Sequence, residues 1–135
     1  MKFNSNSQIC TNEAQSKRLL TLGLKMETAD MRYQIQYLDL GGVLMECTPL
    51  LEPYPPLNND RFIPAWSLHR LIEMMPTIVN PIRNLFLSNK SVEYQMSEGR
   101  TTHIFDSENN VYDNIVNCID WLIKEGYFDK EYLKE

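Results

Sequence analysis

Two histidines each stand close to a carboxylate, and the spacing of these pairs could support chemistry. His69 and Glu73 are four positions apart. On a helix such side chains share a face, so the pair could form half of an acid–base or metal site. A zinc site needs a third protein ligand, and the sequence contains no H-E-x-x-H motif. The alternative, which we favour, is an exposed pair on the polar side of an amphipathic helix.

The second pair, His103 and Asp106, lies near the end of a predicted strand. Successive side chains of a strand leave opposite faces, so an odd spacing directs these two groups apart. A histidine–aspartate dyad would therefore need a bulge, and we expect His103 to pack on one side of the sheet. No G-x-S-x-G elbow is present, and no cysteine has a neighbouring histidine. These patterns identify no catalytic set and favour a protein that is not an enzyme, while the enzymatic alternative stays open.

Residues 58–66 (NNDRFIPAW) join a proline-rich stretch to a predicted helix and combine amide, charged and aromatic groups. Such groups are common at recognition surfaces, which often lie on loops. The candidate binding residues in and around this stretch are Tyr54, Asn59, Asp60, Arg61, Trp66 and His69. For Trp66 we favour burial in the core, because large aromatic side chains are mostly buried.

The cysteines, Cys10, Cys47 and Cys118, are three in number and widely spaced, which argues against a disulfide framework. No C-x-x-C motif is present, so we expect no structural zinc and no other cofactor. Cys118 falls on a predicted apolar helix face, where a thiol behaves as a small hydrophobic group. No signal segment and no apolar run of about 20 residues is found, which predicts a cytoplasmic protein without a membrane partner.

The net charge of −5 bears on nucleic acid as a partner. Nonspecific binding to a phosphate backbone requires a basic face, and the 13 Lys and Arg residues are scattered along the chain. We therefore do not expect nonspecific binding. A small basic patch would still permit sequence-specific binding, which stays open as an alternative.

Three helices are predicted to position these residues. The first covers 12–22, with Asn12 and Gln15 as a capping box and Gly23 as its stop. The second begins at Pro64 and ends before Pro76. The third follows a cap at position 109 or 110 and ends at Gly126, with a short helix within 128–134. Its predicted solvent-facing residues are Asp113, Asn117, Asp120 and Lys124.

The strands are predicted from alternating polarity and turn residues. A strand at 31–38 turns at Gly41 and Gly42 into a partner at 43–47, and strands at 82–87, 91–96 and 101–106 form an antiparallel meander. Residues 48–64 hold five prolines and are predicted to be neither helix nor central strand. We therefore predict a flexible arm at 1–11 and one α+β domain at 12–135. In it, a small antiparallel sheet packs against three helices in the order α-β-β-α-β-β-β-α.

Four segments carry a resemblance to a known group of proteins: residues 28–33 (TADMRY), 63–68 (IPAWSL), 112–114 (YDN) and 121–127 (WLIKEGY). The chain resembles small uncharacterised proteins encoded by gut Bacteroidales, their phages and their mobile elements. The resemblance covers most of residues 12–127. It implies an accessory gene of a phage or an integrated element, and it transfers no activity and no site residue.

Two classes of function are compatible with these observations. The first is a non-enzymatic module that binds a protein partner through the 48–66 region or an exposed sheet edge. The second is a small ligand-binding protein or hydrolase that uses His69, Glu73, His103 or Asp106. The second requires its polar groups to converge in one pocket.

Overall fold

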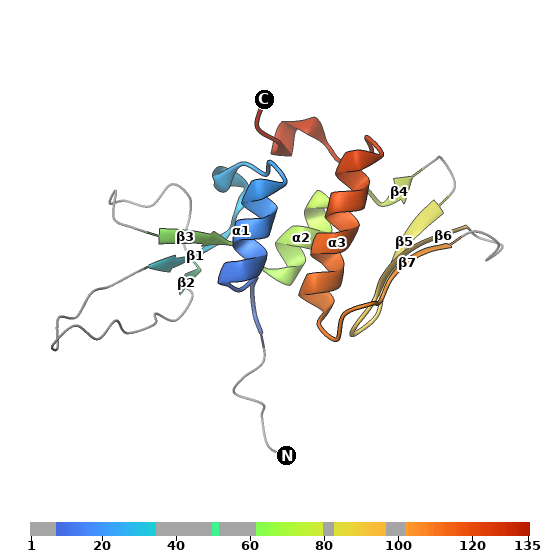
Figure 1. Ribbon diagram of the computed structural model, residues 1–135, viewed down its shortest axis with the longest axis horizontal. Helices are drawn as coiled ribbons and strands as arrows, with labels where there is room; N and C mark the ends of the chain where they lie inside the picture. The colour runs from blue at the N-terminus through green and yellow to red at the C-terminus, as the bar shows by residue number, and fades with distance from the viewer. Residues whose placement is uncertain (1–7, 35–49, 52–61, 80–82, 97–101) are drawn as a thin grey trace, which may run out of the picture.

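The computed structural model describes residues 8–34, 50–51, 62–79, 83–96 and 102–135. Three α-helices lie in the middle of the molecule and two antiparallel sheets lie on opposite sides of them (Figure 1). The helices are α1 (Glu13–Thr21), α2 (Leu68–Met74) and α3 (Val111–Lys124), with 3₁₀ turns at Met26–Thr28 and Lys130–Tyr132. The predicted α+β class is therefore confirmed, although the number and order of strands differ from the prediction.

Helix α1 begins and ends as its sequence predicts. The Asn12 side chain accepts a hydrogen bond from the Gln15 amide (2.8 Å), and the Gln15 side chain accepts one from the Asn12 amide (3.0 Å). At the other end Gly23 has a φ of 106°, a conformation in which glycine is favoured. The chain then turns back, so that the Leu24 amide reaches the Leu19 carbonyl (3.2 Å). These contacts form a Schellman motif.

Helix α3 is capped by Asn110 and ends at Gly126, as predicted. Its predicted solvent-facing side, however, contacts α1. Gln15 Nε2 donates to Asp113 Oδ1 (2.8 Å), and Arg18 Nη1 donates to Asn117 Oδ1 (2.6 Å). The prediction that this whole side faces water is wrong, because α1 packs beside it and supplies polar partners.

The first sheet contains β1 (Met31–Gln34), β2 (Leu50–Leu51) and β3 (Phe62–Ala65) in the order β2-β1-β3. Strand β3 was not predicted, and it includes Pro64, which we had placed at the first position of a helix. Because β3 is an edge strand, proline is tolerated there. Helix α2 instead begins at Leu68, after Ser67 caps it. The predicted partner strand 43–47 lies outside the described residues.

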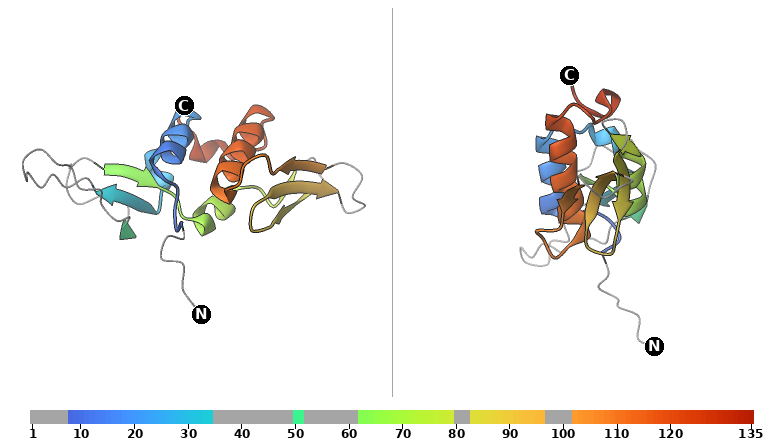
Figure 2. Two further views of the ribbon diagram at one scale, coloured as in Figure 1. Left: turned by 60° about the horizontal axis from the view of Figure 1, so that its bottom comes forward. Right: turned by 90° about the vertical axis from the view of Figure 1, so that its right-hand side faces the viewer.

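The second sheet contains the predicted antiparallel meander. Its strands are β4 (Ile78–Val79), β5 (Arg83–Leu87), β6 (Val92–Met96) and β7 (Thr102–Phe105), in the order β4-β5-β6-β7. The short strand β4 was not predicted. Figure 2 shows the helices α1 and α3 in one layer and the strands in a second. One face of this second sheet packs against α3, and on the opposite face Ile78, Phe86 and Ile104 are about half exposed.

The core joins the three helices to the inner face of the second sheet. Its largest fully buried side chains include Trp66, Tyr94 and Leu122. The end of the predicted arm belongs to the packed structure, since Cys10 and Thr11 are buried and the Thr11 amide donates to the Trp66 carbonyl (2.9 Å). The prediction of a flexible arm at 1–11 is therefore wrong for Cys10 and Thr11. Residues 1–7 lie outside the described part of the chain.

Candidate functional site

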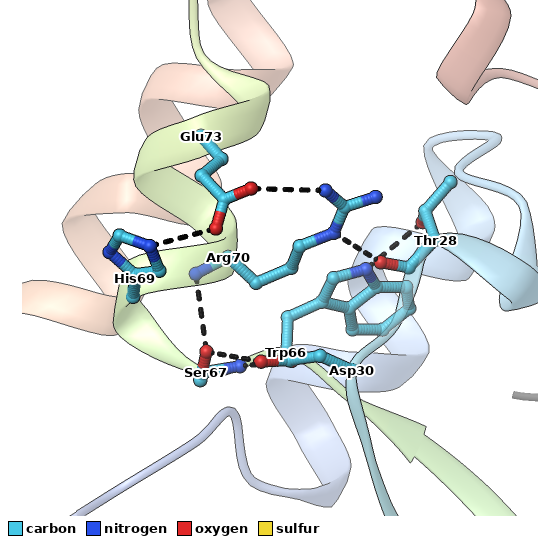
Figure 3. A network of polar contacts seen from close by, with 7 residues as sticks. All are labelled: Thr28, Asp30, Trp66, Ser67, His69, Arg70 and Glu73. Atoms are coloured by element: carbon cyan, nitrogen blue, oxygen red, sulfur yellow. Dashed lines mark hydrogen bonds and ion pairs between the residues drawn. The ribbon is translucent and has the colours of Figure 1, made fainter. Parts of the chain in front are cut away.

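A network of polar contacts lies at the start of α2, and we call it the α2 junction: Thr28, Asp30, Trp66, Ser67 and Arg70 (Figure 3). The Asp30 carboxylate accepts hydrogen bonds from both the amide of Ser67 (2.8 Å) and its hydroxyl. The Ser67 hydroxyl oxygen accepts one from the Arg70 amide (3.1 Å). Asp30 therefore orients Ser67, and Ser67 caps the helix.

The same junction ties α2 to the segment that precedes β1. Arg70 Nε donates to the Thr28 carbonyl (2.7 Å), and Trp66 Nε1 donates to Thr28 Oγ1 (3.0 Å). The Arg70 guanidinium also lies over the Tyr132 ring, 5.6 Å from its centroid. The Nε donor of Arg70 and the Nε1 donor of Trp66 are satisfied within the protein, and Arg70 Nη1 also lies 3.5 Å from Glu73 Oε2, so both side chains act in packing.

Ser67, His69 and Glu73 lie close together along the chain, and the fold brings Asp30 to Ser67, but these residues do not form a catalytic triad. His69 is 84% exposed and lies 2.9 Å from Glu73, and the contact drawn for it in Figure 3 is with Glu73 and not with the Ser67–Asp30 pair. In a catalytic triad the serine hydroxyl bonds to a histidine, whereas the Ser67 hydroxyl donates to Asp30. The arrangement is that of a capped helix start with an exposed ion pair beside it.

The candidate binding residues divide into three groups. Tyr54, Asn59, Asp60 and Arg61 lie outside the described residues. Trp66 is fully buried, as we favoured, so its side chain is not available to a partner at the surface. His69 is exposed and paired with Glu73.

His103 packs on one side of the second sheet, as predicted. Its ring centroid lies 4.5 Å from that of Trp121 on α3. Trp121 also contacts Phe105 (5.8 Å) and Tyr127 (5.7 Å), which gives a part-exposed aromatic cluster. His69 and His103 therefore have separate partners. In the described part of the chain, no group of three His, Cys, Asp or Glu residues is placed to hold a metal ion.

Two cysteines are buried and are poor nucleophiles. Burial raises the pKa of the Cys118 thiol to about 12. Burial also raises the pKa of Cys10, whose sulfur lies 3.5 Å from the Tyr33 hydroxyl. Because the thiolate is the reactive form, both thiols act as core groups at neutral pH. Cys47 lies outside the described residues.

Exposed apolar side chains lie on the face of the second sheet opposite α3, which we call the outer sheet face: Ile78, Phe86, Glu93 and Ile104. The register aligns Phe86 with Glu93 and Glu93 with Ile104 across three strands. The three apolar side chains are 53%, 48% and 51% exposed, in the order Ile78, Phe86, Ile104. Val92 and Tyr94, which alternate with Glu93 along β6, are fully buried on the opposite face.

The sequence analysis did not identify this surface. Alternation along 83–87 and 92–96 was a visible signal, because it separates two sets of side chains. It does not show which set a helix covers, since that depends on where α3 packs. Asn114 was also missed: it is fully buried, its Oδ1 accepts from the Glu108 amide (3.1 Å), and its Nδ2 donates to the Lys90 carbonyl (2.5 Å).

Comparisons with known proteins add no relative to this picture. No protein-family model, no curated protein and no solved structure matches the chain. None of the helices described here is long and apolar enough to cross a membrane. Function is therefore inferred from the arrangement of the residues.

Proposed function

We propose that the chain is a protein-interaction module and that the outer sheet face is its binding surface. The observation that carries this proposal is the half-exposure of Ile78, Phe86 and Ile104 on a sheet whose other face is filled by α3. Apolar side chains gathered on one uncovered face are typical of interaction sites. Single exposed apolar residues are ordinary, but Phe86 and Ile104 flank the same residue, Glu93, on its two neighbouring strands.

The polar residues give less support to the alternative of a hydrolase or ligand-binding protein. His69 pairs with Glu73 on α2, whereas His103 packs on Trp121 of α3. Asp106 is exposed just beyond the end of β7. An active site needs such groups to converge. These three groups instead lie on or beside different elements and contact different residues.

We further propose that the module acts in the cytoplasm as an accessory protein of a phage or mobile element. Support for this setting comes from the segments 28–33, 63–68 and 121–127, which resemble proteins of gut Bacteroidales and their phages. The acidic balance, with a net charge of −5, favours a protein partner over nonspecific binding to nucleic acid.

Site-specific photocrosslinking tests the proposal. A photoreactive residue is placed at Phe86 on the outer sheet face, and the matched control is placed at Lys130, an exposed position away from that face. In an extract of the encoding organism, we expect one saturable product from position 86 and none from position 130. Unlabelled protein should compete with its formation, whereas the variant Ile104→Lys should not.

The opposite result would reject the outer sheet face as the binding surface. One such result is a crosslinked product from position 130 alone. The other is a product from position 86 whose formation is reduced by unlabelled Ile104→Lys as strongly as by the unsubstituted chain. His69→Ala provides a further control, because its exposed side chain lies on α2. It should compete fully.

A further inference from the structure

Strand β7 differs from the other edge strands of the molecule. It is four residues long and, among the described residues, it pairs with β6 alone. Edge strands are commonly protected by proline, by lysine, by a bulge or by being very short. Strands β2 and β4 have two residues each, and β3 contains Pro64. Strand β7 (THIF) has none of these protections.

We infer that β7 binds an extended segment of the partner protein, which joins the second sheet as an additional strand. This inference rests on the proposed function, because the added strand would lie beside Ile104 and extend the outer sheet face. Every second residue of an edge strand directs its amide and carbonyl toward the free edge. Two of the four residues of β7 therefore offer main-chain hydrogen bonds to the segment.

The side chains around β7 define what the segment must contain. Ile104 is 51% exposed, and a residue opposite it on an added strand would lie about 5 Å away. An apolar side chain at that position would cover Ile104. Asp106 is exposed and directly follows the last residue of β7, two positions after Ile104. The residue two positions along the segment would therefore face Asp106.

The charges near Asp106 indicate which residue type the bound segment should carry beside it. Asp106 and Glu108 are exposed, and neither pairs with a cation from the described part of the chain. Glu93 adds a third carboxylate beside Ile104. The segment should therefore carry Lys or Arg two residues from an apolar residue. A second copy of β7 does not fit, because residues 102–108 (THIFDSE) contain no Lys or Arg and would bring further carboxylates.

A synthetic peptide provides the test: acetyl-Thr-Lys-Thr-Val-Thr-Lys-Thr-amide. Its sequence reads the same in both directions, so a lysine lies beside Asp106 in either strand orientation. It is titrated into the full-length ¹⁵N-labelled chain and followed by NMR. We expect saturable shifts of the amides of β7 and its neighbours. N-methylation of the peptide amides that face β7 should weaken binding about fivefold for each blocked hydrogen bond.

Two matched variants locate the binding. Ile104→Lys places a like charge at the edge and should weaken peptide binding about tenfold. Thr21→Lys adds the same charge at an exposed position of α1 and should leave the peptide affinity within about twofold. A peptide with glutamate in place of lysine should bind Asp106→Lys better than it binds the unsubstituted chain.

Strand addition is overturned if the peptide causes no saturable shifts, if N-methylation has no effect, or if Ile104→Lys and Thr21→Lys weaken binding equally. The proposed function is judged separately by the crosslink from position 86. A crosslink without peptide binding would retain the outer sheet face as the interaction surface and remove strand addition. Peptide binding without the crosslink would reject the outer sheet face as the partner's site and leave the β7 edge as a peptide-binding edge only.

Discussion

The α2 junction and the outer sheet face use their residues in opposite ways. The junction gathers Asp30, Ser67 and Arg70, the residue types expected in an active site, yet their hydrogen bonds are made within the protein. The outer sheet face has one charged group, Glu93, and its apolar side chains are about half exposed. Residues of the types found in active sites therefore stabilise the fold at the α2 junction. The outer sheet face, which is mostly apolar, is instead exposed to solvent.

The edges of the two sheets differ in the same way. In the first sheet, Pro64 lies on the edge strand β3, and Cys10 forms a bridge to Ser67 just beyond it. In the second sheet, the edge strand β7 has neither protection. The contrast predicts that changes at the junction affect stability and that changes on the outer sheet face affect binding.

The largest effect is expected at the centre of the junction. Trp66→Ala removes a fully buried side chain and its bond to Thr28, and should lower the free energy of unfolding by about 4 kcal/mol. The matched control Phe86→Ala, another aromatic-to-alanine change, should alter it by about 0.5 kcal/mol. Urea denaturation of both variants measures the difference. Equal losses would remove the distinction between the two regions.

A second large effect is expected at Asn114, which links α3 to the turn between β5 and β6. Asn114→Ala leaves the Glu108 amide and the Lys90 carbonyl without their buried partner, and should cost about 3 kcal/mol. Asn117→Ala, three residues further along the same helix, loses only a bond to Arg18 at the surface. It should cost less than about 1 kcal/mol. A cost at Asn117 as large as that at Asn114 would contradict this assignment.

A smaller effect is expected from the cap of α2. Ser67→Ala removes the hydroxyl that bonds to Asp30 and accepts from the Arg70 amide, and should cost about 1 kcal/mol. Ser67→Thr keeps the hydroxyl and should restore most of that stability. If Ser67 were a nucleophile, Ser67→Ala would abolish turnover of a substrate with little change in the midpoint of thermal unfolding. That result would contradict our interpretation of the α2 junction.

The smallest effect on stability is expected on the outer sheet face. Phe86→Lys and Ile104→Lys replace half-exposed side chains and should each change the free energy of unfolding by about 0.5 kcal/mol. As unlabelled competitors, both variants should nevertheless fail to displace the crosslinked partner. A loss of several kcal/mol in chemical denaturation would show instead that these side chains are needed for folding.

The elements with local signals could be predicted from the sequence. The capping box of Asn12 and Gln15 and the glycines after α1 and α3 lie within a few residues of the helix ends that they determine. Strands β5, β6 and β7 were predicted from alternation and short turns. Pro64 was misassigned because proline suits both a first helical turn and an edge strand, and the choice depends on pairing with β1.

The hydrogen bonds of the α2 junction and the exposure of the outer sheet face could not be predicted, because both depend on residues that are far apart in the sequence. Asp30 and Ser67 are separated by 37 positions, so their bond is not visible as a motif. Gln15 and Asp113, which turn the polar side of α3 toward α1, are 98 positions apart. The exposure of Phe86 and Ile104 depends in turn on which face of the sheet α3 covers.

Hydrogen–deuterium exchange of the chain with and without its crosslinked partner tests the central claim most directly. We predict that the partner slows exchange in β5, β6 and β7, most of all around Ile104, and leaves Trp66–Glu73 of the α2 region unchanged. Slower exchange confined to the α2 region, with no change along β7, would contradict the account and would make the junction the binding site.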